Sequence, residues 1–386
     1  MTSESGDDIR TALKGWSARD KNVTRDELGR MRQKASRVVR PFAGSNFANT
    51  MPHAFARGGG MKRREFIVLL TGSAVWVCGA RAQQAPSVRR IGLLSPFSPA
   101  NTARWERALL LGLRDAGWVN ERNLVIERRY AEGRLERLPE LTGDLLRKKV
   151  EIIVTTVTAD TTAAKNATAD IPIVMVAVGD PVATGFVKSL ARPGANLTGL
   201  SQMTPDLSGK RLELLKEIVP GVSAIALLYN PDDPLSVLDW KEAQRSAQTL
   251  GMKVHSLEVS QTSDLDKVLT EIPALHVGAL VMMPAPVLIE NLKPVADFAI
   301  RSRMPSTFHL REYAEAGGLV SYGVDRSDLF RRAARYIDRI LKGANPADLP
   351  IEQPTKFELV INLKTARELN IAIPPRVLGM ADEVIE

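Results

Sequence analysis

The sequence predicts an α/β protein with two lobes, each built on a parallel β-sheet. From residue 88 onward, short β-branched runs alternate with longer helical patterns, which is typical of βα units that form parallel sheets. The alternation falls into two comparable series, the second of which starts near residue 224. The chain has 386 residues, of which 44% are hydrophobic. Because single cores tend to stop growing near about 250–300 residues, two lobes are expected.

The first series begins with the apolar run at 90–95, which we expect to form a strand. A helix follows it, because Trp105, Leu109, Leu113 and Ala116 recur at three- and four-residue spacing and so share one helical face. Further strands are expected at 124–130, 152–155 and 173–178, and helices at 135–149 and 159–169.

The second series repeats this order. Strands are expected at 224–229, 253–257 and 279–283, and helices at 237–250, 265–272 and 289–302. A later strand at 319–322 precedes a helix at 329–341, which the pair Lys342-Gly343 closes. A proline-marked segment at 346–354 then leads into a strand at 357–362.

Residues 61–82 have the three parts of a secretory signal peptide: basic residues at 62–64, an apolar stretch at 66–77, and small residues at Ala80 and Ala82. The apolar stretch is shorter than the roughly 20 residues that span a bilayer. We therefore expect export, by the Sec or the twin-arginine route, and cleavage near Ala82. Residues 1–60 are expected to be absent from the mature protein, because translation then starts at Met61; a basic helical extension is the alternative.

The net charge of +8 comes entirely from this N-terminal part of the chain. Met1 to Ala82 holds 15 basic and 7 acidic side chains, which leaves 37 of each sign in the remaining 304 residues. A neutral body argues against a nucleic-acid partner. The single cysteine, Cys78, lies in the signal peptide, so the mature chain is expected to have no disulfide and no thiolate site.

Motifs for catalysis are absent from the sequence. Neither GxGxxG nor GxxxxGK[ST] occurs, which argues against nucleotide enzymes, and there is no HExxH or GxSxG for a zinc or serine hydrolase. No pair of carboxylates stands out as a general acid and base. We therefore expect a protein that is not an enzyme and that carries no cofactor and no metal.

Polar and aromatic side chains follow several of the expected strands, where open parallel sheets bind ligands. Thr158 opens a helix whose free N–H groups could hold a carboxylate, although plain N-capping explains it equally well. Asp180 could pair with a ligand ammonium, but an aspartate before proline is also a common helix start. The candidate ligand-binding residues are Ser95, Phe97, Thr155, Thr158, Asp180, Tyr229, Pro284, Tyr322 and Asp325.

Three longer strings are specific enough to indicate a family: the segment from Gly179-Asp180-Pro181 to Asn196-Leu197-Thr198-Gly199, the segment 340–350, and the segment 357–366. From about residue 89 to the C-terminus the chain resembles ABC-transporter substrate-binding proteins that include tryptophan- and tyrosine-type uptake proteins.

The resemblance implies a type I periplasmic binding fold, with two Rossmann-like lobes and a ligand cleft between them. It implies that the chain crosses near Ser201, returns near Leu319 and crosses again near Pro350. One lobe would then comprise 88–200 and 319–350, and the other 201–318 and 351–386. In such proteins Ser or Thr at strand ends of the first lobe bind a carboxylate, which implies this role for Ser95, Thr155 and Thr158, while Asp180 is the acidic position for an ammonium.

The expected function is capture of a small organic solute, amino-acid-like or an aromatic carboxylate, by lobe closure in the periplasm. The expected partners are that small-molecule ligand and an inner-membrane permease with its ATPase, and the protein is expected to be a monomer. A periplasmic ligand-sensing module that feeds a membrane receptor is the main alternative. A transcription regulator of the same fold, or an exported enzyme, fits less well, because the sequence has no helix-turn-helix and no catalytic motif.

Overall fold

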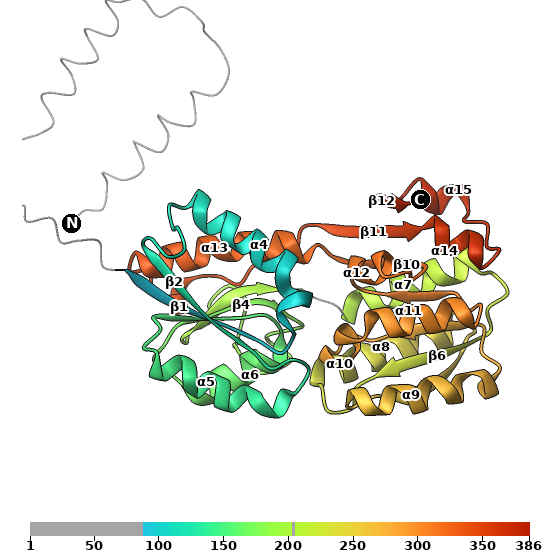
Figure 1. The fold of residues 1–386 in the computed structure, drawn as a ribbon, viewed down its shortest axis with the longest axis horizontal. Coiled ribbons are helices and arrows are strands. Elements are labelled where there is room, and N and C mark those ends of the chain that lie inside the picture. The colour runs from blue at the N-terminus through green and yellow to red at the C-terminus, as the bar shows by residue number, and fades with distance from the viewer. Residues whose placement is uncertain (1–87, 203–204) are drawn as a thin grey trace, which may run out of the picture. The chain divides into compact units, whose positions relative to one another are not determined.

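A computed structural model describes residues 88–202 and 205–386 of the chain. These residues belong to one compact unit that spans 83–386. The signal peptide at 61–82, the extension at 1–60 and Cys78 lie outside the described residues. Figure 1 shows two lobes side by side, each with a β-sheet covered by helices.

The first lobe contains a five-stranded parallel sheet in the order β2-β1-β3-β4-β5. Helices α5 and α6 cover one face, and α4 and α13 cover the other (Figure 1). The strands β3 and β4 are buried along their whole length, which explains their continuous apolar sequence. The elements are β1 (Arg89–Ser95), α4 (Pro99–Asp115), β2 (Leu124–Tyr130), α5 (Leu138–Arg147), β3 (Ile152–Thr155), α6 (Thr158–Ala167), β4 (Ile173–Val178), β5 (Leu197–Ser201) and α13 (Arg326–Leu341).

The second lobe contains a seven-stranded sheet in the order β12-β11-β10-β9-β8-β6-β7. Its pairs are parallel except for β10 and β11, which are antiparallel. The elements are α7 (Pro205–Ile218), β6 (Ala224–Tyr229), α8 (Pro234–Thr249), β7 (Lys253–Glu258), α9 (Thr262–Glu271), β8 (Ala279–Met282), α10 (Pro286–Glu290), α11 (Leu292–Arg301), β9 (Ser306–Phe308), α12 (Arg311–Glu315), β10 (Val320–Val324), β11 (Phe357–Asn362), α14 (Leu363–Glu368), α15 (Pro375–Leu378) and β12 (Glu383–Ile385).

The chain returns to the first lobe later than expected. The strand β10 pairs with β9 and β11, so residues 319–324 belong to the second sheet and the boundary at 319 is wrong. The return lies between Val324 and the start of α13 at Arg326. The next crossing is also later, because Glu352 still pairs with Leu200 beside β5. The sequence of a single strand does not indicate which sheet the strand joins, because this depends on the strands with which it pairs.

The structure contains elements that the sequence patterns did not indicate: the 14-residue helix α7 and the short elements β5, β9, β12, α12, α14 and α15. The helix expected at 289–302 is divided into α10 and α11 at Asn291, whose backbone leaves the helical region. Strands of three residues are too short to show a period of two, which explains why β9 and β12 were not expected.

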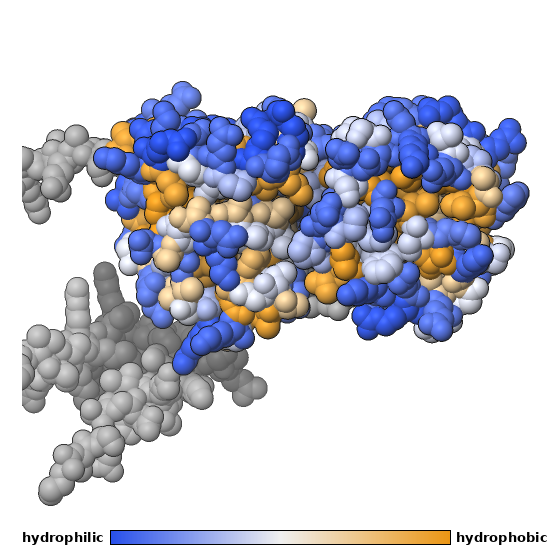
Figure 2. Space-filling model, turned by 90° about the horizontal axis from the view of Figure 1, so that it is seen from below, coloured by the Kyte–Doolittle hydropathy of each residue, from blue (hydrophilic) through white to orange (hydrophobic). Residues whose placement is uncertain are grey.

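The surface mixes residue types on both lobes. Figure 2, seen from below, shows hydrophobic residues at the surface of each lobe with hydrophilic residues between them. The exposed large hydrophobic side chains of the described residues include Leu111 and Val119 in the first lobe and Phe357 and Met380 in the second. Scattered exposure of this kind is normal for a folded domain. No helix in the described part of the chain is long and apolar enough to cross a membrane.

Candidate functional site

Side chains from both lobes enclose a small cavity where the lobes meet. Its volume is about 10 Å³, which is room for about one water molecule. A solute the size of an amino acid therefore requires the two lobes to separate before it can enter. The cavity is lined by Phe97, Val157, Thr158 and Gln202 from the first lobe, by Asp233, Leu235, Pro284, Ala285, Pro286 and Ile289 from the second, and by Arg326 where the chain returns to the first lobe.

Three of the nine candidate residues line this cavity. Phe97 lies just after β1, and its ring contacts Trp105 edge-on at a centroid distance of 5.5 Å. Thr158 begins α6, and its Oγ1 accepts a hydrogen bond from the backbone N–H of Gly179. Pro284 follows β8 on the opposite wall. The expectation that strand ends converge on one place is therefore met by these three residues.

Two candidates lie beneath the cavity and are engaged by their neighbours. Ser95 Oγ accepts a hydrogen bond from the N–H of Phe97 and lies 3.4 Å from Thr156 Oγ1. Thr155 Oγ1 lies 2.7 Å from Thr161 Oγ1. Both side chains are completely buried and neither lines the cavity. Their hydroxyl groups stabilise the turns after β1 and β3.

The other four candidates also lie outside the cavity lining. Asp180 accepts hydrogen bonds from the N–H groups of Val182 and Ala183 in a turn, and the helix expected to start there is absent, because no helix lies between β4 and β5. Tyr229 stacks on Trp240 and donates its hydroxyl hydrogen to Glu258. Asp325 caps α13, because its carboxylate accepts from the N–H of Asp328. Tyr322 is half-buried in β10, where it packs against the apolar cluster of the second lobe.

The sequence patterns missed Arg326, which is the first residue of α13 and is only 4% exposed. Its Nη2 lies 3.3 Å from Gln202 Oε1 and 3.3 Å from His309 Nε2. Its guanidinium carbon lies 4.8 Å from the Trp105 ring centroid and 5.9 Å from that of Phe97. The sequence feature that could have indicated Arg326 is its place directly after the candidate segment Tyr322–Asp325, where a strand ends.

Burial shifts the titration of the polar groups around the cavity. It lowers the pKa of Arg326 to about 10, so the guanidinium stays charged at neutral pH. Burial and the charge of Arg326 hold the pKa of His309 well below its usual range, so this ring is neutral. Burial raises the pKa of Asp233 to about 6, although its carboxylate accepts from the N–H of Leu235 at the start of α8. The cavity thus contains one cation and one carboxyl group that already caps a helix.

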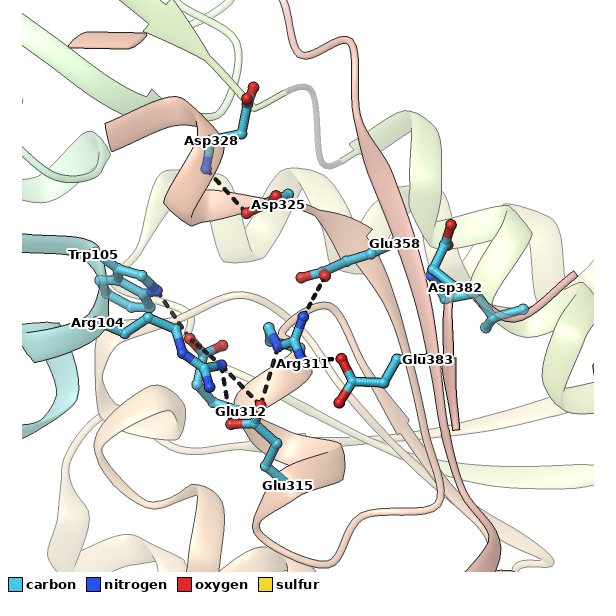
Figure 3. A network of polar contacts seen from close by, with 11 residues as sticks. Arg104, Trp105, Arg311, Glu312, Glu315, Asp325, Asp328, Glu358, Asp382 and Glu383 are labelled. Carbon is cyan, nitrogen blue, oxygen red and sulfur yellow. Dashed lines mark hydrogen bonds and ion pairs between the residues drawn. The ribbon is translucent and has the colours of Figure 1, made fainter. Parts of the chain in front are cut away.

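Polar contacts join the lobes on either side of this cavity. Figure 3 shows Arg104 and Trp105 of α4 pointing toward α12 of the second lobe. Trp105 Nε1 donates to Glu312 at 2.9 Å, and Arg104 Nη1 donates to Glu315 at 2.8 Å. Elsewhere the N–H of Ser98, which precedes α4, donates to the Glu290 carboxylate of α10 at 2.8 Å. These contacts hold the two lobes so close together that only the small cavity remains between them.

A binding function is compatible with the chemistry of the described residues. No group of three or more histidine, cysteine, aspartate or glutamate side chains in this part of the chain could hold a metal ion. What the cavity offers is a charged guanidinium, amide and hydroxyl groups, and apolar walls. Such a mixture of apolar surface and a few placed polar groups is typical of small-molecule sites.

Comparisons with known proteins agree with this description. The model of the family "ABC transporter substrate binding protein" matches residues 91–385. The chain is similar to a tyrosine-binding protein of Clostridioides difficile (strain R20291), with 25% identity over 286 residues that cover 73% of this chain and 81% of the relative.

Two solved structures have a similar fold. One is an ABC domain in complex with L-Trp from Streptococcus pneumonia, with a TM-score of 0.72 and 28% identity over 78% of this chain and 100% of that chain. The other is a conserved domain protein from Vibrio cholerae, with a TM-score of 0.73 and 27% identity over 77% of this chain and 100% of that chain. The two-lobed type I periplasmic binding fold that the sequence resemblance implied is confirmed. Because the family model matches most of its length, the chain belongs to the ABC transporter substrate-binding proteins, which are non-catalytic components of transport.

Proposed function

We propose that this protein is the exported solute-binding component of an ABC importer, and that it captures an amino-acid-like or aromatic carboxylate between its lobes. The observation that carries the proposal is the cavity at the lobe junction, where Arg326 and Gln202 are buried and have side-chain atoms without a hydrogen-bond partner. Leaving buried polar groups unpaired costs free energy, so a group that a ligand supplies would stabilise this arrangement. The names of relatives that bind tyrosine or are solved with L-Trp support an amino-acid-like solute.

Binding would proceed by lobe closure. The cavity is too small to hold a solute, so the lobes would open about the three crossing segments, admit the solute, and close around it less tightly than in the arrangement that the Trp105 and Ser98 contacts hold. The closed form would then dock, as a monomer, on an inner-membrane permease whose ATPase drives uptake. The signal-peptide pattern at 61–82 supports a periplasmic location.

A thermal-shift titration of the full chain with L-tyrosine, L-tryptophan and small aromatic acids tests binding. A ligand that binds the native state raises the melting temperature by an amount that grows with its concentration. We expect such a rise for at least one of these compounds, and no rise with any of them would contradict the proposed solute class. Uptake of the binding compound by cells with and without the gene then separates import from sensing, because only an import role predicts that uptake is lost.

A further inference from the structure

We propose that the solute carries a carboxylate group that binds to Arg326 and Gln202 at the lobe junction, and not to the hydroxyl groups of Ser95 and Thr155. This inference rests on the proposed solute-binding function and specifies the chemistry of its ligand. Three observations support it: Arg326 and Gln202 have buried polar atoms without a partner, Arg326 carries a positive charge, and neighbouring side chains hold its guanidinium in place.

The unpartnered atoms around Arg326 are all hydrogen-bond donors. Arginine has only donors, so Gln202 Oε1 and His309 Nε2 must both accept from its Nη2. The free end of the Gln202 amide is therefore its NH₂ group, and the proton of the neutral His309 ring is on Nδ1. Buried atoms without a partner are Arg326 Nε and Nη1, Gln202 Nε2 and His309 Nδ1. Three of these four donors belong to Arg326 and Gln202, which line the cavity, and an acceptor group is needed to complete them.

The charge of the cluster is positive and is not balanced by an ion pair. In the described part of the chain, no carboxylate oxygen lies within 4.0 Å of the Arg326 guanidinium. The acids near it are engaged elsewhere. Glu312 accepts from Trp105 Nε1, Asp160 accepts from backbone N–H groups at the start of α6, and Asp233 caps α8. A buried cation without a counterion is unfavourable, so a bound anion would be strongly favoured at this place.

The guanidinium is held in position from two sides. The rings of Trp105 and Phe97 lie against it at 4.8 and 5.9 Å, and Gln202 and His309 fix its Nη2. A donor that is already oriented loses little entropy when it binds a ligand. By contrast, the hydroxyl groups of Ser95 and Thr155 are engaged with protein neighbours and do not reach the cavity. The carboxylate site is therefore displaced from the ends of β1 and β3 to the start of α13, just after β10.

The remaining walls define the rest of the ligand. Leu235, Pro284, Pro286 and Ile289 present apolar surface opposite Arg326. The one carboxyl group that lines the cavity, Asp233, already caps α8 through the N–H of Leu235. The ligand that fits is a carboxylate with an apolar or aromatic body.

Matched acid and amide pairs test this inference on the full chain. Equilibrium dialysis is carried out with L-tryptophan, L-tyrosine, indole-3-acetate and phenylacetate, each beside its carboxamide, and the retained compounds are quantified by mass spectrometry. We expect the acids to be retained and each amide to bind roughly tenfold to a hundredfold more weakly, since hydrogen bonds to charged groups are the stronger ones. Arg326→Gln should weaken retention of the acid by a similar factor, and Arg326→Lys by less. Arg339→Gln is the matched control, because Arg339 is an exposed arginine on the same helix.

The outcomes are distinct. If the wild-type protein retains acids and amides equally, or if Arg326→Gln binds the acid as the wild type does, the Arg326 site is refuted while solute binding stands. If the wild type retains none of the eight compounds, the proposed solute class fails, and this inference fails with it. If Arg326→Gln does not fold, Arg326→Lys, which keeps the charge but not the geometry, tests the residue, and the acid-against-amide contrast on the wild-type protein tests the carboxylate.

Discussion

Arg211 of α7 and Asp239 of α8 form a buried ion pair in the second lobe. We expect a large loss of stability when one of the two partners is removed alone. Both side chains have an exposed fraction of 0%, and Arg211 Nη2 lies 3.2 Å from Asp239 Oδ2. Ser208 Oγ accepts from Arg211 Nη2 at 2.7 Å and lies 3.2 Å from the same carboxylate oxygen. Removal of one charge leaves the other buried and unpaired.

We expect Asp239→Asn and Arg211→Met each to lower the free energy of unfolding by about 3–5 kcal/mol, the usual cost of an uncompensated buried charge. The double variant Arg211→Met/Asp239→Leu should recover most of this loss, because apolar residues of similar volume replace buried pairs at little cost. The exposed pair Arg245–Glu242 on α8 is the control, and Arg245→Met should cost less than about 1 kcal/mol.

The two single variants should differ in their dependence on pH. Burial raises the pKa of Asp239, and the charge of Arg211 opposes this rise, so the pKa rises further in Arg211→Met. A carboxyl group with a raised folded-state pKa contributes stability below its unfolded pKa of about 3.9, and this stability is lost as the pH rises through the folded pKa. The pKa of Asp239 is about 7 in the wild type, so both proteins should lose stability in parallel from about pH 4 up to that pH. Above it, Arg211→Met should keep losing stability while wild type levels off, by about 1.4 kcal/mol for each further unit of pKa.

Urea unfolding of wild type, both single variants and the double variant at about pH 6 and about pH 8.5, on either side of the wild-type pKa of Asp239, measures all of these quantities. A loss of stability in the double variant that equals the sum of the two single losses would refute the reasoning, because the charges would then not be compensating each other. A pH profile of Arg211→Met parallel to that of wild type would refute the titration part alone.

Three further predictions concern lobe closure and local structure. Glu290→Gln removes the carboxylate that accepts from Ser98 N–H before α4, and should shift the lobes toward the open form by about 0.5–1 kcal/mol, measured by electron–electron distances between spin labels on the two lobes; unchanged distances would contradict it. Gly199→Ala should lower the free energy of unfolding by at least about 3 kcal/mol, because φ is +134° and a Cβ would lie 2.0 Å from a carbonyl oxygen of β4. The control Gly117→Ala, with φ +91° and open space around it, should lower it by about 1–2 kcal/mol. Equal losses in thermal unfolding would refute the steric argument. Burial raises the pKa of Asp160 to about 7, so its contribution to stability is present below about pH 4 and is lost as the pH rises to about 7. Asp160→Asn should therefore flatten this part of the plot of unfolding free energy against pH, measured in urea. A plot that keeps the wild-type slope would contradict this.

Hydrophobic patterns along the chain were enough to predict the βα alternation and the fold class. Hydrophobic periodicity depends only on neighbouring residues, so strands such as β2, β3, β6 and β11 were predicted with the bounds that the structure shows. Local hydrogen bonding was also predictable where a side chain meets its own turn. Asp180 shows this in part: its position before a proline indicated a helix start, and its carboxylate accepts from the N–H groups of Val182 and Ala183, but these close a turn and no helix follows.

Long-range pairing and packing in the folded chain set which strand joins which sheet and which side chains reach the cavity. β10 joins the second lobe because β9 and β11 lie beside it, and these partners are separated from it by many residues or by a whole helix. Ser95 and Thr155 are at strand ends, as expected, but their hydrogen-bonding capacity is used by adjacent turns. Arg326 becomes a candidate binding residue only when Gln202, His309 and two aromatic rings from distant segments surround it, because burial and the absence of a partner are properties of the folded chain and leave no local pattern in the sequence.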